Sequence, residues 1–236
     1  QQALDLVKRI MHPMTTCYIY SRSCWLELMK GDLEQVETLA EALYRRAHKY
    51  GFKNFEFAAL FFKNLVILNE NEDHNNALDS MQKNLEAYYV TKTTLNRTAF
   101  MLFFAKACLK VGQRSQGLNA IEQCTKLGEK TGELWFQAEA WRVKGELLLI
   151  CENDRKVSEA ENLEAVNCFW NAYKVAQEQS AKMWELRAAI SLAKWYQSKG
   201  LQEKGKQILA ETYGWFTEGF ETEDLQKARA LLKSLN

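Results

Sequence analysis

The sequence predicts an all-α fold, a right-handed superhelical solenoid of about five to six helical hairpins closed by a C-terminal capping helix. The first observation is a period of 40 to 48 positions, which separates five small or apolar residues in similar local settings: Cys24, Leu65, Ala105, Gly145 and Ala193. Such a period is typical of stacked repeat units. The second observation is that the 236 residues include one proline and 11 glycines, too few for strands joined by turns.

A second spacing predicts that each unit is a pair of helices. In four of the five units another small or apolar residue follows 12 positions later, at Val36, Ala77, Gly117 and Gly205. In the fourth unit the gap is 20 residues and ends at Ala165, so about eight extra residues fall within 151–158. We expect a tolerated surface loop there, because long surface insertions cost little closure entropy.

We expect one repeat domain over residues 1–236. Residues 1–13 are predicted to end a truncated earlier repeat, since Pro13 cannot continue a helix. The chain starts within a helical pattern and without Met, which suggests a fragment of a longer protein. The repeats are predicted at 14–51, 52–92, 93–131, 132–181 and 182–218, and the capping helix at 219–236.

Turn and cap residues justify these elements in order. Gly31-Asp32 is predicted to separate the first two helices, and Gly51 suits a left-handed cap after the second. The next hairpin, with helix A at 53–69, turns in a polar loop at 69–76, whereas the third and fifth turn at Gly112 and Gly200.

The fourth hairpin and the last helix carry start signals. The first helix of the fourth hairpin is predicted at about 133–151. After the insertion, Ser158 with Glu161 fits a capping box that starts the second helix of that hairpin. Thr222 is the predicted N-cap of the last helix, and the two acidic residues after it favour a helix start.

Composition argues against several classes of protein. The net charge is +1, with 31 basic and 30 acidic residues well mixed, so we expect no nucleic-acid partner. No run approaches the length of a membrane span, and no leader is visible, so we expect a cytoplasmic chain. The six cysteines contain no C-x-x-C pair and favour reduced core thiols, without a metal or cofactor.

No catalytic residue is predicted. Gly200 to Lys206 fits the start of a phosphate-binding loop, but residue 207 is Gln and the segment joins two helices, so a structural turn is favoured. The residues at 70–74 suit a solvated turn better than a metal loop. Seven phenylalanines at helical spacing are predicted to be mainly core, although one of the adjacent Phe61 and Phe62 is expected to face a groove.

Three repeats carry residues of the tetratricopeptide (TPR) motif. They are Trp141, Gly145 and Leu148 in the fourth, Ala189, Leu192, Ala193 and Tyr196 in the fifth, and Met101, Phe104, Ala105 and Cys108 in the third. These units resemble TPR hairpins with longer helices. The resemblance implies a scaffold that binds other molecules on its concave face.

The C-terminal half resembles a narrower family. The segments 140–149, 185–193, 213–220 and 224–232 are similar to the C-terminal repeat region of bacterial multidomain signalling proteins. Those proteins join a cyclase, winged-helix or kinase-like domain to a STAND-type ATPase and TPR-like repeats. The resemblance implies a non-catalytic regulatory region that binds a protein or peptide partner, or other domains of its parent.

Six residues are predicted to point toward the concave face: Lys106, Arg142, Glu146, Arg187, Ile190 and Lys194. Two interpretations stay open. The charged members can bind a peptide or an acidic ligand through charge-assisted hydrogen bonds, or they can bridge adjacent repeats as ion pairs. A small-molecule sensor is the alternative function, an enzyme is the least favoured, and a homodimer through uncovered solenoid ends stays open.

Overall fold

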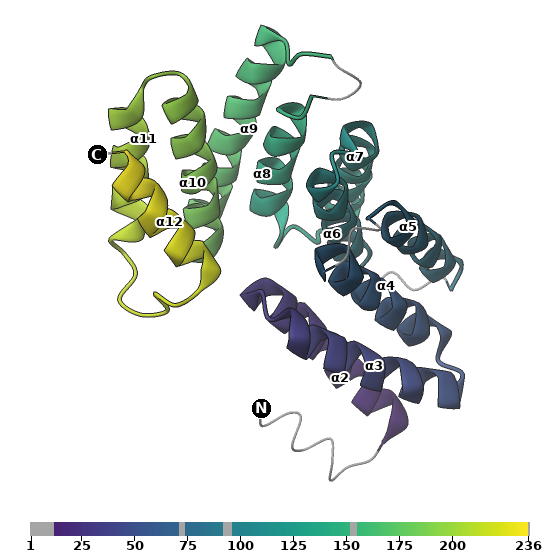
Figure 1. Ribbon diagram of the computed structural model, residues 1–236. Helices are drawn as coiled ribbons and strands as arrows, with labels where there is room; N and C mark the ends of the chain where they lie inside the picture. Colours follow the sequence, from purple (N-terminus) through teal and green to yellow (C-terminus); the bar gives the residue numbers. More distant parts are fainter. Residues whose placement is uncertain (1–11, 71–73, 92–95, 152–154, 236) are drawn as a thin grey trace. The chain divides into compact units, whose positions relative to one another are not determined.

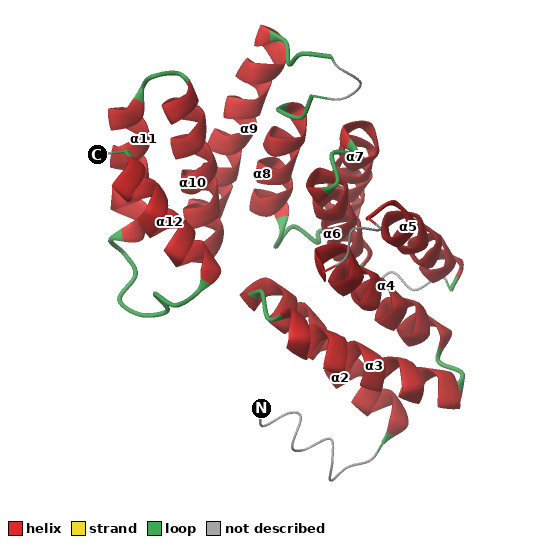
Figure 2. Cartoon of the chain, in the orientation of Figure 1, coloured by secondary structure: helices red, strands yellow, loops and turns green. Residues whose placement is uncertain are grey.

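The structure, a computed structural model, describes residues 12–70, 74–91, 96–151 and 155–235 (Figure 1). Within these ranges every element of regular secondary structure is an α-helix and no β-strand occurs (Figure 2), which confirms the all-α prediction. Most of the predicted end of an earlier repeat, at 1–13, lies outside the described residues. The handedness of a superhelix and the number of repeats stay predictions.

The chain forms two compact units, residues 1–100 and 101–236, which are described separately. Among its described residues, the first unit contains the start of α6 (Arg97–Lys110) and four complete helices, α2 (Pro13–Lys30), α3 (Leu33–Tyr50), α4 (Lys53–Glu70) and α5 (His74–Val90). Helices α2 to α5 pack consecutively, α2 with α3, α3 with α4 and α4 with α5, and α2 also packs against α4. Helix α4 therefore has neighbours on more than one side.

Local signals explain where the first helices of this unit begin and end, although Pro13, predicted to close the segment 1–13, instead starts α2. Pro13 occupies the first turn of α2, where its missing N–H costs nothing. Gly31 and Gly51 end α2 and α3 with φ of 86° and 71°, the left-handed region that glycine adopts without strain. The Asp32 carboxylate accepts a hydrogen bond from the Gln35 backbone N–H and so starts α3.

An aromatic core fills the first unit and corrects one expectation. Phe61 and Phe62 are both buried, so the prediction that one of them faces a groove is wrong. The Phe62 ring lies 4.8 Å from that of Trp25 on α2, whereas the Phe61 ring lies 4.9 Å from that of Phe100. Adjacent aromatic residues can both be buried here because α4 packs against neighbours in different directions.

In the part of the second unit that the structure describes, α6 from Met101 onward is followed by six further helices, α7 (Arg114–Thr131), α8 (Gln137–Leu148), α9 (Glu159–Glu178), α10 (Lys182–Ser198), α11 (Gln202–Tyr213) and α12 (Glu223–Ser234). From α7 to α12 each helix packs against the next. Helix α10 also packs against α8 and α12, its next-but-one neighbours. Stacked helical hairpins produce this pattern, so the unit is consistent with an α solenoid.

The predicted small residues lie where helices cross. A Cβ atom on Gly145 would lie 2.5 Å from Phe169 Cε1 and 2.9 Å from the Ala165 carbonyl oxygen. A Cβ atom on Gly205 would lie 3.0 Å from the Ala193 Cα. The residues that the predicted gaps of 20 and 12 positions separate, Gly145 with Ala165 and Ala193 with Gly205, therefore meet where two helices cross. Gly205 packs against α10 and Gly200 is a turn with φ of 71°, which confirms the structural interpretation of this G-x4-G-K segment.

The insertion in the fourth hairpin begins earlier in the chain than predicted. Helix α8 ends at Leu148 rather than about 151, and the middle of the loop, 152–154, lies outside the described residues. The capping box is confirmed, since Ser158 Oγ accepts from the Glu161 N–H at 3.2 Å and Glu161 Oε2 accepts from the Ser158 N–H at 2.8 Å.

The last helix also begins as predicted, with one difference at its cap. Thr222 is the N-cap residue of α12, but its hydroxyl donates to the Gly219 carbonyl at 2.7 Å and makes no capping bond. Gly219 turns the chain with φ of 76°. The hydroxyl therefore stabilises the turn before the helix rather than the helix itself.

Candidate functional site

Helix α8 presents two different surfaces on opposite faces. Successive residues of an α-helix are rotated by about 100°, so Glu139, Arg142 and Glu146 share one face. Trp141 and Lys144 lie on the opposite face by the same geometry. The first face carries an ionic cluster, and the second lines an open groove.

Glu139 is the centre of the ionic cluster. It is 2% exposed, and its carboxylate accepts hydrogen bonds from Arg142 Nε at 2.7 Å and Nη2 at 2.9 Å. Lys106 Nζ of α6 lies 3.2 Å from Glu139 Oε1, and Arg187 Nη1 of α10 lies 3.6 Å from the same oxygen. Three cations from three helices therefore face one buried carboxylate.

Two more carboxylates complete the cluster. Glu146 Oε1 lies 2.5 Å from Arg142 Nη1 and accepts a hydrogen bond from Ser191 Oγ of α10 at 2.9 Å. Asp224, in the first turn of α12, accepts from Arg187 Nε at 2.7 Å. The term ionic cluster refers below to six residues: Lys106, Glu139, Arg142, Glu146, Arg187 and Asp224. Its three cations and three carboxylates balance and join α6, α8, α10 and α12.

The ionic cluster shifts the pKa values of Glu139 and Lys106. Burial raises the pKa of Glu139, but the charges of Arg142, Lys106 and Arg187 outweigh it and hold that pKa well below its usual range. Burial lowers the pKa of Lys106, and the nearby Glu139 only partly offsets this. Glu139 is therefore an ionised carboxylate, not a proton donor, at neutral pH.

The structure brings together four of the six predicted concave-face residues. Lys106, Arg142, Glu146 and Arg187 belong to the ionic cluster, in the bridging arrangement. Ile190 is instead buried in the apolar core, and Lys194 is exposed on α10. Glu139 and Asp224 were not predicted. The available signal for Glu139 was its position three residues before Arg142, which suits an ion pair on one helix face.

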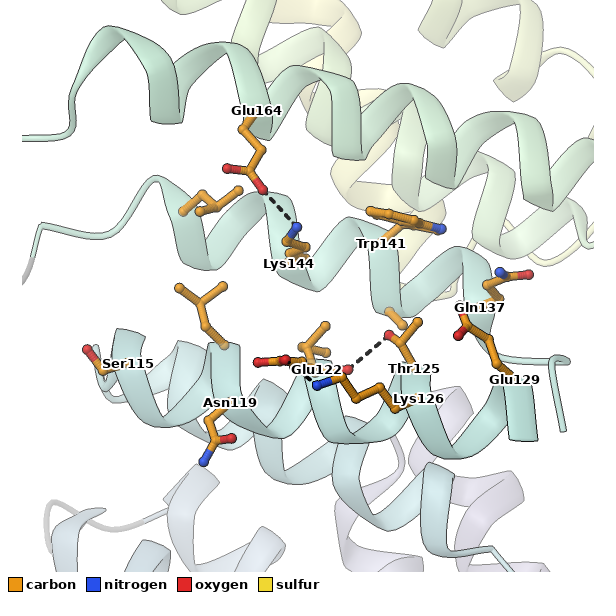
Figure 3. A pocket seen from close by; sticks show the side chains of 14 residues that line it. Ser115, Asn119, Glu122, Thr125, Lys126, Glu129, Gln137, Trp141, Lys144 and Glu164 are labelled. Carbon is orange, nitrogen blue, oxygen red and sulfur yellow. Dashed lines mark hydrogen bonds and ion pairs between the residues drawn. The ribbon is translucent and has the colours of Figure 1, made fainter. Parts of the chain in front are cut away.

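The opposite face of α8 forms one wall of a groove of about 630 Å³, and α7 forms the other (Figure 3). Its apolar lining comes from both helices: Leu118, Ile121, Ala140, Trp141 and Leu148. The polar and charged side chains that line it include Asn119, Glu122, Lys126 and Glu129 of α7, Lys144 of α8 and Glu164 of α9. Residue spacing had indicated that Trp141 is a motif residue but had not predicted this groove.

The charged residues of the groove mainly bind one another. Lys144 Nζ donates to Glu164 Oε1 at 2.7 Å and lies 5.6 Å from the centre of the Trp141 ring (Figure 3). Lys126 Nζ donates to Glu122 Oε1 at 2.6 Å. Partial burial lowers the pKa of Lys144, but the hydrogen bond to Glu164 and nearby negative charge raise it above its ordinary value. These ion pairs leave the apolar part of the groove without a convergent set of polar groups.

The remaining reactive groups have structural surroundings. Among the described residues, no three His, Cys, Asp or Glu side chains are grouped to hold a metal ion. Five cysteines are free and buried, and only Cys151 is exposed. Burial raises the pKa of Cys24, Cys108 and Cys124 to about 12, which makes these thiols poor nucleophiles.

Within the described ranges, every helix is too short or too polar to cross a lipid bilayer. Comparison with known protein families and with curated proteins found no match.

Proposed function

We propose that this chain is a non-catalytic scaffold of TPR-like hairpins, the C-terminal regulatory part of a larger bacterial signalling or transcription-regulatory protein. It holds a protein partner or another domain of its parent. The observation that carries the proposal is the open groove between α7 and α8, which has an apolar floor and charged margins. Such a composition is typical of surfaces that bind other proteins.

The ionic cluster has a supporting role in this proposal. Its cations already face Glu139, Glu146 and Asp224, so an acidic ligand on that side has to displace a carboxylate of the chain itself. The groove requires no such displacement. We therefore assign the cluster to holding neighbouring hairpins together and the groove to binding, instead of the concave-face residues expected from the sequence.

Site-specific cross-linking in the native host tests the proposal. A photoreactive amino acid replaces Asn119 in the groove, and a control protein carries it at the exposed Lys204 on α11. We expect one protein to cross-link from position 119 only, and then to bind the purified chain directly. The proposal fails if every candidate partner cross-links equally from both positions and none binds in purified form.

A small-molecule sensor is the second candidate, because the groove volume lies within the range of about 300–1,000 Å³ found for ligand sites. An aromatic floor at Trp141 also suits a ring-containing or sugar ligand. A thermal-shift screen against sugars and metabolites tests this candidate. A compound that stabilises the wild type but not the Trp141→Ala protein would favour the sensor over the scaffold.

A further inference from the structure

The shape and charge of the groove indicate a particular class of partner. It extends along α7 from Ser115 to Glu129, about 21 Å at 1.5 Å per residue. An α-helix of about four turns has this length. Both walls are helices whose lining residues recur at three- and four-residue intervals, and such ridges accept the side chains of a third helix.

The apolar residues define the contact face of that partner. Leu118 of α7 and Trp141 of α8 are the partly exposed apolar residues of the floor, and the buried Ile121 and Leu148 also line it. Leu118 and Trp141 are partly buried and pack against the core, so the floor is held in place before anything binds. An amphipathic helix with apolar residues at i, i+3, i+4 and i+7 matches this floor.

The charged residues that line the groove indicate which charge the partner helix carries along its margins. Among the described residues that line the groove, three are carboxylates, Glu122, Glu129 and Glu164, and two are ammonium groups, Lys126 and Lys144. Lys126 is paired with Glu122 and Lys144 with Glu164, so the excess negative charge of the lining is that of Glu129, which lies seven residues after Glu122 on α7. Basic residues along one margin of a bound helix would complement this face.

A compact small molecule fits the groove less well. Ligand pockets present a few convergent polar groups to fix orientation, whereas the lysines here already bind glutamates at the margins. The floor between them is apolar and open along its length (Figure 3). An elongated apolar face with charged edges is the complement of such a surface.

On this basis, and resting on the proposed scaffold function, we infer that the groove formed by α7, α8 and Glu164 of α9 binds an amphipathic α-helix of a partner protein whose polar margin is basic. The helix lies along α7, with its apolar face on Leu118 and Trp141 and its basic margin beside Glu122 and Glu129.

Three labelled peptides of about 16 residues serve as probes. One is an amphipathic helix with lysine margins, the second has glutamate margins on the same apolar face, and the third is a scrambled form of the first. Fluorescence anisotropy with the full chain measures their affinity. We expect the lysine-margined peptide to bind most tightly and the scrambled peptide not to bind.

Two variants locate the binding. Leu118→Glu places a charge on the apolar floor and is expected to weaken binding of the lysine-margined peptide about tenfold or more. Leu201→Glu is the matched control at an exposed leucine outside the groove, and it should leave binding unchanged. The double variant Glu122→Lys, Glu129→Lys changes exposed residues only, so it tests the charge match without relying on the floor, and it should reverse the preference to the glutamate-margined peptide.

The results separate this inference from the scaffold function. The inference is overturned if the lysine- and glutamate-margined peptides bind equally, or if Glu122→Lys, Glu129→Lys does not change their order. It is also overturned if a purified partner protein binds the wild type and Leu118→Glu equally, and in that case the scaffold function still stands. Absence of both a peptide and a protein partner would overturn both proposals.

Discussion

Glu139 provides a direct test of how the second unit is held together. Its replacement by glutamine keeps the size of the side chain but removes the charge at the centre of the ionic cluster. Glu139 is 2% exposed and faces Arg142 at 2.7 Å, Lys106 at 3.2 Å and Arg187 at 3.6 Å. The two arginines keep Glu146 and Asp224 as partners, whereas Lys106 loses the carboxylate that it faces.

The size of the effect follows from this arrangement. Removing one partner of a buried ion pair costs about 3–5 kcal/mol, because the remaining charge stays out of water. Glutamine still accepts a hydrogen bond from Arg142, so we expect Glu139→Gln to lower the free energy of unfolding by about 3 kcal/mol at neutral pH. Glu122→Gln is the control, since it breaks a solvent-exposed pair with Lys126 and should change the free energy of unfolding far less.

The pH dependence of stability is a second, independent test of the role of Glu139. The pKa of Glu139 is lower in the folded chain than in the unfolded chain, so its stabilisation is fully present above the unfolded value of about 4.3. The stabilisation decreases as the pH falls below that value. The difference between wild type and Glu139→Gln should therefore narrow in acid. Urea denaturation followed by circular dichroism measures the difference, and a difference no larger than that of Glu122→Gln at neutral pH would show that Glu139 does not hold the second unit together.

Three other predictions test the fold. Gly145→Ala should lower stability by about 1–2 kcal/mol, because the clash with the fully packed Phe169 ring and a backbone oxygen outweighs the gain in helix propensity; a more stable protein in urea denaturation would contradict the crossing. Ser158→Ala should cost about 1 kcal/mol in the same assay, and no change would mean that the capping box does not stabilise α9. A thiol reagent should modify only Cys151 in the folded chain, and mass spectrometry that finds a second labelled cysteine would contradict the burial of the other five.

The sequence was most informative where a local rule decides the structure. Gly31 and Gly51 cap helices through their own backbone conformations, and the Ser158 box depends only on residues three positions apart. The end of α8 was less predictable, because the apolar pattern continues past Leu148 without a glycine or proline stop. Burial of both Phe61 and Phe62 depends on the number of helices around α4, which no local pattern specifies.

The candidate site was predictable where helical spacing alone decides which residues share a helix face. Helical spacing indicated that Lys106, Arg142, Glu146 and Arg187 lie on the same side of the first helix in successive repeats, and the structure brings them together. It did not indicate Asp224, whose contact with Arg187 depends on how α12 packs against α10. The groove was missed because its width depends on how α7 and α8 cross, and residue spacing does not determine a crossing angle.

A partner is expected to bind in the groove and not on the ionic cluster. Nuclear magnetic resonance of the full chain, titrated with the lysine-margined peptide, distinguishes the two surfaces directly. We predict that the Trp141 indole and Thr125 methyl resonances shift, while the guanidinium resonances of Arg142 and Arg187 do not. Shifts of those guanidinium groups with no change at Trp141 and Thr125 would contradict the account.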